Sequence, residues 1–446
     1  NYDGILAEGA LNVPLGDTSA LRVSYQGSWR DGYVSDGSSD DKHQSVRAQL
    51  LFEPTPDFSF RLLGNYQHLG GVGHGQVIYG ETAPSGPGIT SGPIQPDDRW
   101  TSINDSLNEL IDDLLAPPGT YPIDTSLLRQ DVDAWGVSAH LDWDLGPATL
   151  TVIPAYQRVV NDSQSFPTLS FNTTNPYNGD PSTSDAQTLE VRLANADGPL
   201  VWVLGGYFFN EDQDSLNEVS LGFVSDTAFI ADLNTRAYAA FGEVTYSLTD
   251  TFRLTAGLRY TDETKTVDAH RYARLGSLQC LAGGDGPGNS CELLTSAGTN
   301  VMGTYSADRL NWKLGVEYDV GMDNLLYATA ATGFKSGGQA NADLDPYMPE
   351  DVLAFTVGSK NEFADGMVRL NLEGFYYEYQ DRQENFSSLD RGGAQVSSIF
   401  NAGKAVAKGA SIELVLAPSA NDTFSFSGEY VDSEYRDFTY RNYRPG

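Results

Sequence analysis

The two cysteines of this 446-residue sequence, Cys280 and Cys291, are its clearest candidates for covalent chemistry. Four glycines separate them, within a polar stretch from 265 to 304 that favours a long loop. In an oxidising setting, a disulfide would close a loop of about twelve residues and stabilise it by about 3 kcal/mol on the chain-entropy model. Free thiols or a metal-binding pair are the alternatives, but no third or fourth soft ligand lies nearby. We therefore predict a disulfide.

Histidine and aspartate side chains offer weaker candidates for metal binding. His68 and His74 could form a pair of ligands, although two imidazoles without further ligands are little evidence for a site. Four aspartates could hold Ca²⁺ through carboxylate oxygens, but they lack the spacing of a known calcium loop and favour a solvated acidic loop: Asp31, Asp36, Asp40 and Asp41. The glycine run at 70–75 is followed by a polar loop rather than a helix, so it does not predict a phosphate site. We predict no metal and no cofactor.

Catalytic motifs are missing from the sequence. Neither a Gly-x-Ser-x-Gly elbow nor a His-Glu-x-x-His motif occurs, and His43 and His140 have no motif-linked serine. The chain carries 60 acidic and 27 basic residues, a formal net charge of −33. Nucleic-acid binding needs Lys/Arg patches to neutralise phosphates, and no such patch is visible. We therefore expect neither an enzyme nor a nucleic-acid-binding protein.

Apolar and polar residues alternate along most of the chain. In the segment 252–260, Phe252, Leu254 and Leu258 occupy one set of positions, and Arg253 and Arg259 occupy the other. Successive side chains of a strand point to opposite faces, so this pattern predicts strands with one apolar and one wet face. The same alternation occurs at 21–30, 368–373 and 424–430. No run of 18 apolar residues is present, which argues against a transmembrane helix.

The length and connection of these strands favour a transmembrane barrel. About sixteen such segments occur, many of them about 11 to 16 residues long, whereas strands of globular proteins centre on five or six. A tilted strand needs about 9 to 11 residues to cross a bilayer. Short turns rich in Gly, Pro, Asn and Asp alternate with long loops, expected near 31–41, 70–130, 163–183, 215–231, 265–304, 337–349 and 385–395. This asymmetry is typical of outer-membrane barrels, whose periplasmic turns are short and whose extracellular loops are long.

The expected strand directions also bear on domain organisation. If the short turns are periplasmic, the first strand (about 3–13) runs away from the extracellular side and the last one (about 422–436) runs back to it. A bacterial barrel with periplasmic termini does not start and stop at the extracellular rim. We therefore expect residues 1–446 to form one barrel segment that is incomplete at both ends.

The longest loop, 70–130, carries the candidate ligand contacts. Leu107, Leu110, Ile111, Leu114 and Leu115 recur at helical spacing and predict a short helix there. If this loop folds over the barrel mouth, its aromatic residues would contact a ligand: Tyr79, Trp100 and Tyr121. The alternative is a helix that packs only its own loop.

Several segments, in order, resemble the barrel of the TonB-dependent outer-membrane receptors. The resemblance covers nearly the whole chain and is carried by Asn12-Val13-Pro14-Leu15, Arg30-Asp31-Gly32-Tyr33, the run 47–55, Ala331-Thr332-Gly333-Phe334-Lys335-Ser336-Gly337-Gly338, Pro349-Glu350, Asn401-Ala402-Gly403-Lys404-Ala405 and Gly409-Ala410-Ser411-Ile412-Glu413. Members of this family have a 22-stranded barrel filled by an N-terminal plug domain. The resemblance would make this chain strands 2 to 17, without the plug and its TonB-binding box.

The resemblance implies a receptor in the outer membrane of a Gram-negative bacterium. Such a receptor takes up a scarce solute, most often a ferric siderophore, with energy delivered by TonB through the plug. Uptake of carbohydrate, haem or cobalamin, or a passive porin of about sixteen strands, are the alternatives. The expected partners are TonB, the solute, and outer-membrane lipid and lipopolysaccharide. Arginines that face the lumen could attract an anionic siderophore, and the candidates are Arg22, Arg30, Arg253 and Arg259. The alternative is that these arginines pair with acidic residues of the lumen.

Overall fold

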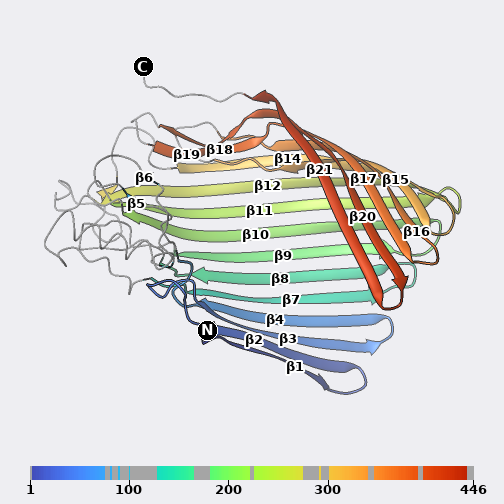
Figure 1. Cartoon of the computed structure of the whole chain (residues 1–446), viewed down its shortest axis with the longest axis horizontal. Coiled ribbons are helices and arrows are strands. Elements are labelled where there is room, and N and C mark those ends of the chain that lie inside the picture. Colours follow the sequence, from blue (N-terminus) through green and yellow to red (C-terminus); the bar gives the residue numbers. More distant parts are fainter. Residues whose placement is uncertain are drawn as a thin grey trace.

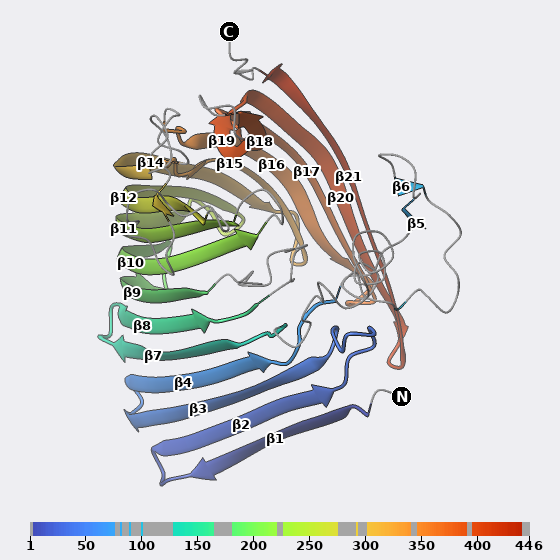
Figure 2. The same ribbon diagram turned by 90° about the vertical axis from the view of Figure 1, so that its left-hand side faces the viewer.

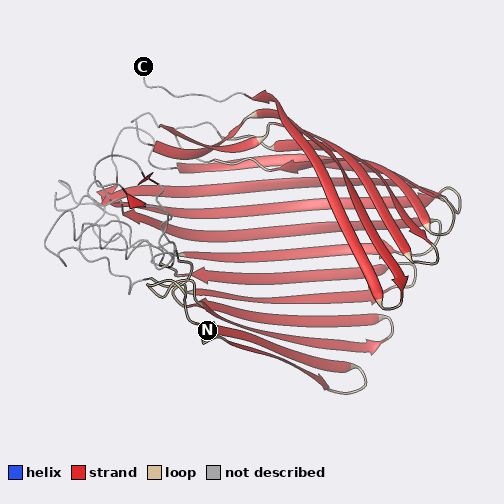
Figure 3. Cartoon of the chain, in the orientation of Figure 1, coloured by secondary structure: helices blue, strands red, loops and turns tan. Residues whose placement is uncertain are grey.

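The computed structural model describes residues 3–75, 81–82, 89–90, 100, 128–164, 181–220, 226–274, 291–292, 301–339, 346–389 and 395–438. In this part of the chain the regular elements are all β-strands, as Figure 3 shows. None of the described segments forms a helix long and apolar enough to cross a membrane. The expectation of an all-β fold is confirmed.

The main sheet has 17 strands, one of which, β13 (Cys291–Glu292), contributes two residues. The other sixteen are β1 (Ile5–Pro14), β2 (Ser19–Arg30), β3 (Asp41–Thr55), β4 (Phe58–Gly70), β7 (Val132–Asp144), β8 (Thr149–Asn161), β9 (Ser182–Asn195), β10 (Leu200–Ser220), β11 (Asp226–Ser247), β12 (Phe252–Arg274), β14 (Val301–Asp319), β15 (Asn324–Lys335), β16 (Glu350–Phe363), β17 (Val368–Gln380), β20 (Gly403–Ser419) and β21 (Asp422–Phe438). Two small hairpins lie outside this sheet: β5 (Glu81–Thr82) with β6 (Ile89–Thr90), and β18 (Gln383–Leu389) with β19 (Gln395–Asn401).

Each long strand pairs antiparallel with the next one along the chain, so the sheet is a continuous meander. Figure 1 shows the strands side by side, and Figure 2 shows the sheet curving around a central space. In the described residues, β1 pairs only with β2 and β21 only with β20. These two strands are therefore the edges of the sheet. The prediction of about sixteen antiparallel barrel strands is confirmed.

The alternation of the two faces follows the sequence pattern. On β11, Ala237 and Ala239 are 8% and 9% exposed, whereas Tyr238 between them is 50% exposed. On β12, Arg259 lies on the inner, concave face with these alanines, whereas Leu254 and Leu258 lie on the outer face and are 38% and 58% exposed. Sheet curvature brings inner side chains together and spreads outer ones apart, which explains why the apolar face is the more exposed.

Aromatic residues form two belts on the outer face. Near the short-turn end lie Trp143, Tyr246 and Tyr318, and eight positions further along the strands lie Trp135 and Tyr238, all of them exposed. Eight residues at about 3.3 Å per residue, on strands tilted by about 40°, correspond to a height of roughly 20 Å. This height fits the apolar band of about 25 Å between the aromatic girdles of outer-membrane barrels.

The connections agree with the expected asymmetry, with corrections on the long-loop side. Short turns join consecutive long strands at one end of the sheet, and glycines in three of them, Gly146, Gly198 and Gly321, have positive φ values of 90°, 93° and 91°. The prediction of a loop at 215–231 is wrong, since β10 extends to Ser220 and β11 begins at Asp226. Of the residues expected as a loop at 385–395, those that the structure describes, 385–389 and 395, belong to β18 and β19. Period-two patterns fade where strands leave the membrane and both faces meet water, which is why the sequence missed these extensions.

Candidate functional site

The inner face of the sheet holds the cationic side chains that a solute inside the barrel would meet. Arg253 on β12 is paired with acids of β14: its Nε donates to Glu317 at 2.7 Å, and its Nη2 donates to Asp319 at 2.8 Å. Arg22 on β2 instead donates to the amide oxygen of Asn12 at 3.1 Å. The expectation that lumen arginines pair with lumen acids therefore holds for Arg253 but not for Arg22.

Arg259, on the inner face of β12, is held by aromatic rings rather than by an acid. Its guanidinium carbon lies 5.7 Å from the ring centre of Tyr207 on β10 and 5.5 Å from that of Phe241 on β11. Its Nε donates to the Thr261 hydroxyl at 3.2 Å. Among the described residues no carboxylate forms an ion pair with it. Cation–π contacts orient a guanidinium without neutralising it, so this charge stays available to an anion.

A pocket of about 290 Å³ opens beside this arginine on the inner wall. It is lined by Tyr207, Phe209, Ala237, Ala239, Arg259, Thr261, Glu263, Phe334 and Ser336. The two alanines leave the space that larger side chains would fill. Gly205 has a related role, because a Cβ there would lie 2.4 Å from Cζ of Phe241. The pocket can therefore bind a small anionic or aromatic group, and it offers no paired nucleophile and base.

A polar cluster at the long-loop rim positions one wall of this pocket. Glu350 is 6% exposed and accepts hydrogen bonds from Arg382 Nη1 and from the Gln383 amide, both at 2.8 Å. The Gln383 side chain donates to the carbonyl oxygens of Ser336 at 2.9 Å and Met348 at 3.0 Å. These bonds tie the segment after β15 to the start of β18. Ser336 is thereby fixed where it lines the pocket.

The aromatic residues predicted to contact a ligand are described only in part. Trp100 is 43% exposed, and its ring packs edge-on against Tyr33 with centroids 5.2 Å apart. Its carbonyl accepts a hydrogen bond from the Ser35 amide at 3.0 Å. Tyr79, Tyr121 and the helix predicted at 107–115 lie outside the described residues. Their roles as ligand contacts stay predictions.

The predicted disulfide also stays a prediction. Cys291 belongs to β13, where it is in register with Ala273 of β12. Cys280 lies outside the described residues.

Asp40, in the acidic segment at 31–41, is buried rather than solvated, whereas Asp31 of the same segment is exposed as its composition suggested. The Asp40 side chain is 1% exposed and accepts hydrogen bonds from the amides of Val72, at 3.0 Å, and Gly73, at 2.9 Å. Lys42 lies 3.3 Å from the same carboxylate. This aspartate thus ties the loop after β2 to the loop after β4. A sequence cannot show which distant amides will meet a carboxylate, so this role was missed.

A second carboxylate of the rim, Asp41, is held by side chains. It accepts a hydrogen bond from the Ser28 hydroxyl at 2.7 Å and contacts His43 Nδ1 at 2.6 Å. The hydrogen bond from Ser28 and then that with His43 lower the pKa of the Asp41 carboxyl below its ordinary value. Both acids therefore serve to fasten the rim.

His68 meets aspartates rather than the second histidine considered above. Its Nδ1 lies 3.0 Å from Asp133 and 3.9 Å from Asp131, and the Tyr66 hydroxyl donates to Asp133 at 2.6 Å. Within the described ranges these three residues, His68, Asp131 and Asp133, form the group whose ligand atoms could converge on a metal ion. The same hydrogen bonds satisfy the groups without a metal.

Residues 88–445 match the family model described as the β-barrel of TonB-dependent receptor-like proteins. The pesticin receptor of Yersinia pestis is 24% identical over 256 residues, which cover 55% of this chain and 33% of that protein. The chain thus matches about a third of the length of this curated relative.

Two solved structures share the fold over almost the whole chain. The ferric yersiniabactin uptake receptor FyuA of Yersinia pestis superposes with a TM-score of 0.68 at 16% identity, covering 97% of this chain and 60% of the receptor. The siderophore receptor PiuA of Acinetobacter baumannii gives a TM-score of 0.68 at 15% identity, covering 98% and 64%. At these identities the likeness concerns the fold alone.

Proposed function

Because this chain belongs to the TonB-dependent receptors and forms part of their outer-membrane β-barrel, we propose that it serves the active uptake of a ferric siderophore across the outer membrane of a Gram-negative bacterium. The whole protein is the unit of this activity, since the chain covers 60% of a comparable solved receptor. Receptors of this family are transport proteins rather than enzymes. The lumen and its rim are the parts of the proposed pathway that this chain supplies.

The partners follow from the two faces of the sheet. Its exposed apolar outer face, between two aromatic belts, suits outer-membrane lipid and lipopolysaccharide. TonB would act through a plug domain that lies outside this chain, inside a barrel of which these sixteen long strands are a segment. Uptake would then depend on differential binding of the solute by the closed and open states, with no covalent step.

One observation carries the choice of an anionic solute: Arg259 lies on the lumen wall between two aromatic rings, without a carboxylate partner among the described residues. The chain as a whole carries a net charge of −33. A cation left unpaired in so acidic a protein would attract a negatively charged solute locally, where low-dielectric walls strengthen the field. A ferric siderophore with carboxylate or catecholate groups fits this description, and the aromatic walls suit rings of the ligand.

The other candidate solutes differ in whether they would bind the unpaired guanidinium of Arg259 in the pocket. Haem carries carboxylates and would also use Arg259, whereas a neutral carbohydrate or cobalamin would gain little from an unpaired guanidinium. A passive porin is not supported, because the family match over 88–445 is to receptors energised by TonB.

The test is uptake by cells that express the full-length protein under iron starvation. Radiolabelled ferric siderophores of carboxylate and catecholate type are supplied, and haem, cobalamin and maltodextrin serve as alternative solutes. We expect ferric siderophore uptake that disappears when TonB is deleted. Siderophore uptake that is unaffected by loss of TonB would refute the proposed TonB-dependent uptake. If only a neutral solute is taken up in a TonB-dependent way, the proposed siderophore substrate is wrong.

A matched pair of variants examines the pocket. Arg259→Gln is expected to weaken siderophore uptake by roughly 10- to 150-fold, because a hydrogen bond to a charged group contributes about 1.5–3 kcal/mol. Arg236→Gln is the control, because this substitution removes the same charge from the neighbouring strand β11. Arg236 lies on the outer face of the sheet, beyond the aromatic belt. Equal siderophore uptake by the two variants would show that Arg259 does not bind the siderophore during uptake.

A further inference from the structure

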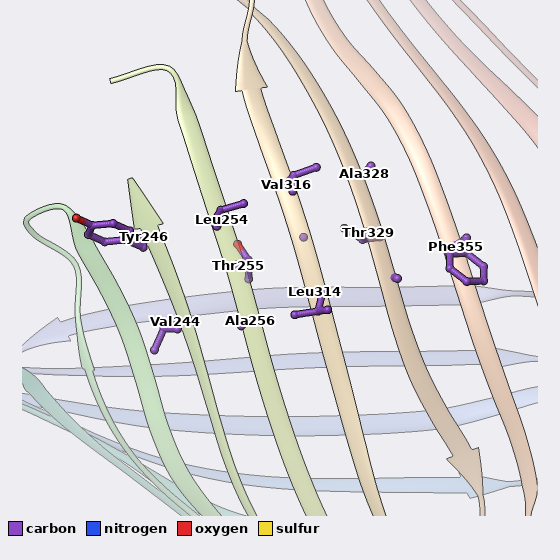
Figure 4. Close-up of a pocket in the computed structure, with 12 residues that line it drawn as sticks. Val244, Tyr246, Leu254, Thr255, Ala256, Leu314, Val316, Ala328, Thr329 and Phe355 are labelled. Carbon is purple, nitrogen blue, oxygen red and sulfur yellow. The ribbon is translucent and has the colours of Figure 1, made fainter. Parts of the chain in front are cut away.

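The outer face of the sheet is not uniform, because a groove of about 580 Å³ crosses it. Figure 4 shows the side chains that line the groove on β11, β12, β14, β15 and β16, with Tyr246 towards one end and Phe355 at the other. Two rows of outward side chains form the groove, and each row runs across neighbouring strands in register. One row consists of Val244, Ala256, Leu314 and Ala330, and the other of Tyr246, Leu254, Val316 and Ala328.

Small residues between large ones create this hollow. Ala256 on β12 and Ala328 and Ala330 on β15 stand at outward positions that elsewhere on this wall carry Leu, Val or aromatic residues. Their neighbours Leu314 and Phe355 project from the wall and are 56% and 46% exposed. Alternating small and large side chains therefore leave a hollow of about 580 Å³ in this wall.

The level of the groove identifies the leaflet that it faces. Tyr246 belongs to the aromatic belt at the short-turn end, and β11 ends one residue later at Ser247. On β11, β12 and β14 the groove therefore lies in the periplasmic half of the apolar band. It is continuous with the surface that hydrocarbon covers, so its occupant is a molecule of the membrane itself.

We propose that this groove is a binding site for one acyl chain of a phospholipid from the periplasmic leaflet. Inside a bilayer, burial of apolar area gives no net gain, because lipid tails are as apolar as leucine, and preference arises from packing. A hollow that hydrocarbon does not fill loses the dispersion contacts of its lining atoms. An ordered chain seated between the large side chains makes contacts on three sides, whereas a chain against a flat wall makes them on one. The position of the groove in the periplasmic half of the membrane disfavours lipopolysaccharide as its occupant, since the acyl chains of lipopolysaccharide occupy the other leaflet.

The experiment counts phospholipid molecules that stay bound to the full-length protein. Protein extracted in a mild detergent is supplied with palmitoyl-oleoyl phosphatidylethanolamine and weighed by native mass spectrometry. The double variant Ala256→Leu/Ala330→Leu fills the groove with apolar side chains of the kind already present on this wall. Ala139→Leu on β7 is the control, since Ala139 also faces outward, in register with Leu62.

We expect the double variant to retain several-fold less phosphatidylethanolamine than the wild type, and the control to retain as much as the wild type. Each protein is first shown to be folded by the shift in electrophoretic mobility on heating. Equal retention by wild type and double variant would overturn the proposal, as would an equal loss in the control. Loss of bound lipopolysaccharide instead of phosphatidylethanolamine from the double variant would assign the groove to another occupant and overturn the proposal. None of these outcomes bears on siderophore uptake, so the proposed function is tested separately.

Discussion

Replacing Asp40 with alanine is expected to release two rim segments from one another, the loop after β2 and the loop after β4. The Asp40 carboxylate is almost completely buried and accepts hydrogen bonds from the amides of Val72 and Gly73. Both donors belong to a segment more than thirty residues away, so this one side chain bridges the two loops. The barrel strands do not depend on the bridge, and the effect should stay local.

The size of the expected effect follows from the two hydrogen bonds that the main-chain amides of Val72 and Gly73 donate to Asp40. A hydrogen bond to a charged group contributes about 1.5–3 kcal/mol, and the lower figure applies here because both amides can turn to water at the rim. Their combined loss, about 3 kcal/mol, corresponds to opening that is roughly a hundredfold more frequent. Asp40→Asn keeps one acceptor oxygen without the charge, so we expect about half that free energy and roughly tenfold more opening.

The assay is amide hydrogen exchange of the full-length protein in detergent, followed on peptides that contain Val72 and Gly73. Asp17→Asn, in an exposed turn at the opposite end of the sheet, is the matched control and should leave the exchange of these peptides unchanged. If Asp40→Ala also leaves their exchange rates unchanged, the carboxylate does not hold the loops together and the reasoning fails.

Three further predictions concern other parts of the sheet. Arg253→Ala breaks hydrogen bonds to two carboxylates of β14 and is expected to lower the free energy of unfolding by about 1–3 kcal/mol, measured from urea unfolding. Gly409→Ala places a Cβ 2.2 Å from a main-chain carbonyl oxygen of β21, so we expect a loss of about 1–3 kcal/mol and a lower yield of heat-modifiable protein. The pKa of Asp41 is lowered by its hydrogen bonds with Ser28 and His43, so its stabilising contribution is present above the ordinary value of 3.8 and is lost as the pH falls through the lowered pKa. Asp41→Asn should therefore be less stable than the wild type at neutral pH, and the difference should close in acid.

Controls separate these effects from general damage. Arg253→Lys keeps one charge contact and should be intermediate between wild type and Arg253→Ala. For the glycine, the reference is Gly9→Ala, because a Cβ at Gly9 meets nothing within 4 Å. If both glycine variants behave alike, close approach is not the reason. A stability difference for Asp41→Asn that persists unchanged well below pH 3.8 would contradict the assignment of its pKa.

The period-two pattern determined most of the fold. Alternation of apolar and polar residues depends only on the strand backbone, which turns every second side chain to the same face. Glycine, proline, asparagine and aspartate at the short turns carry their own backbone preferences, so these turns were predicted in place. Arg253 and Arg259 could be assigned to the wet face for the same reason.

Pairing across the sheet was decided only by the tertiary structure. The sequence places Arg253 and Arg259 six positions apart on one face, yet one is neutralised by acids of β14 and the other lies between the rings of Tyr207 and Phe241. Asp40 reaches its amides only when two loops meet. Each of these contacts depends on strand register and on loop shape, which join residues far apart in the chain. Local preferences do not contain that information, because it comes from how the whole sheet closes its hydrogen bonds and packs its side chains.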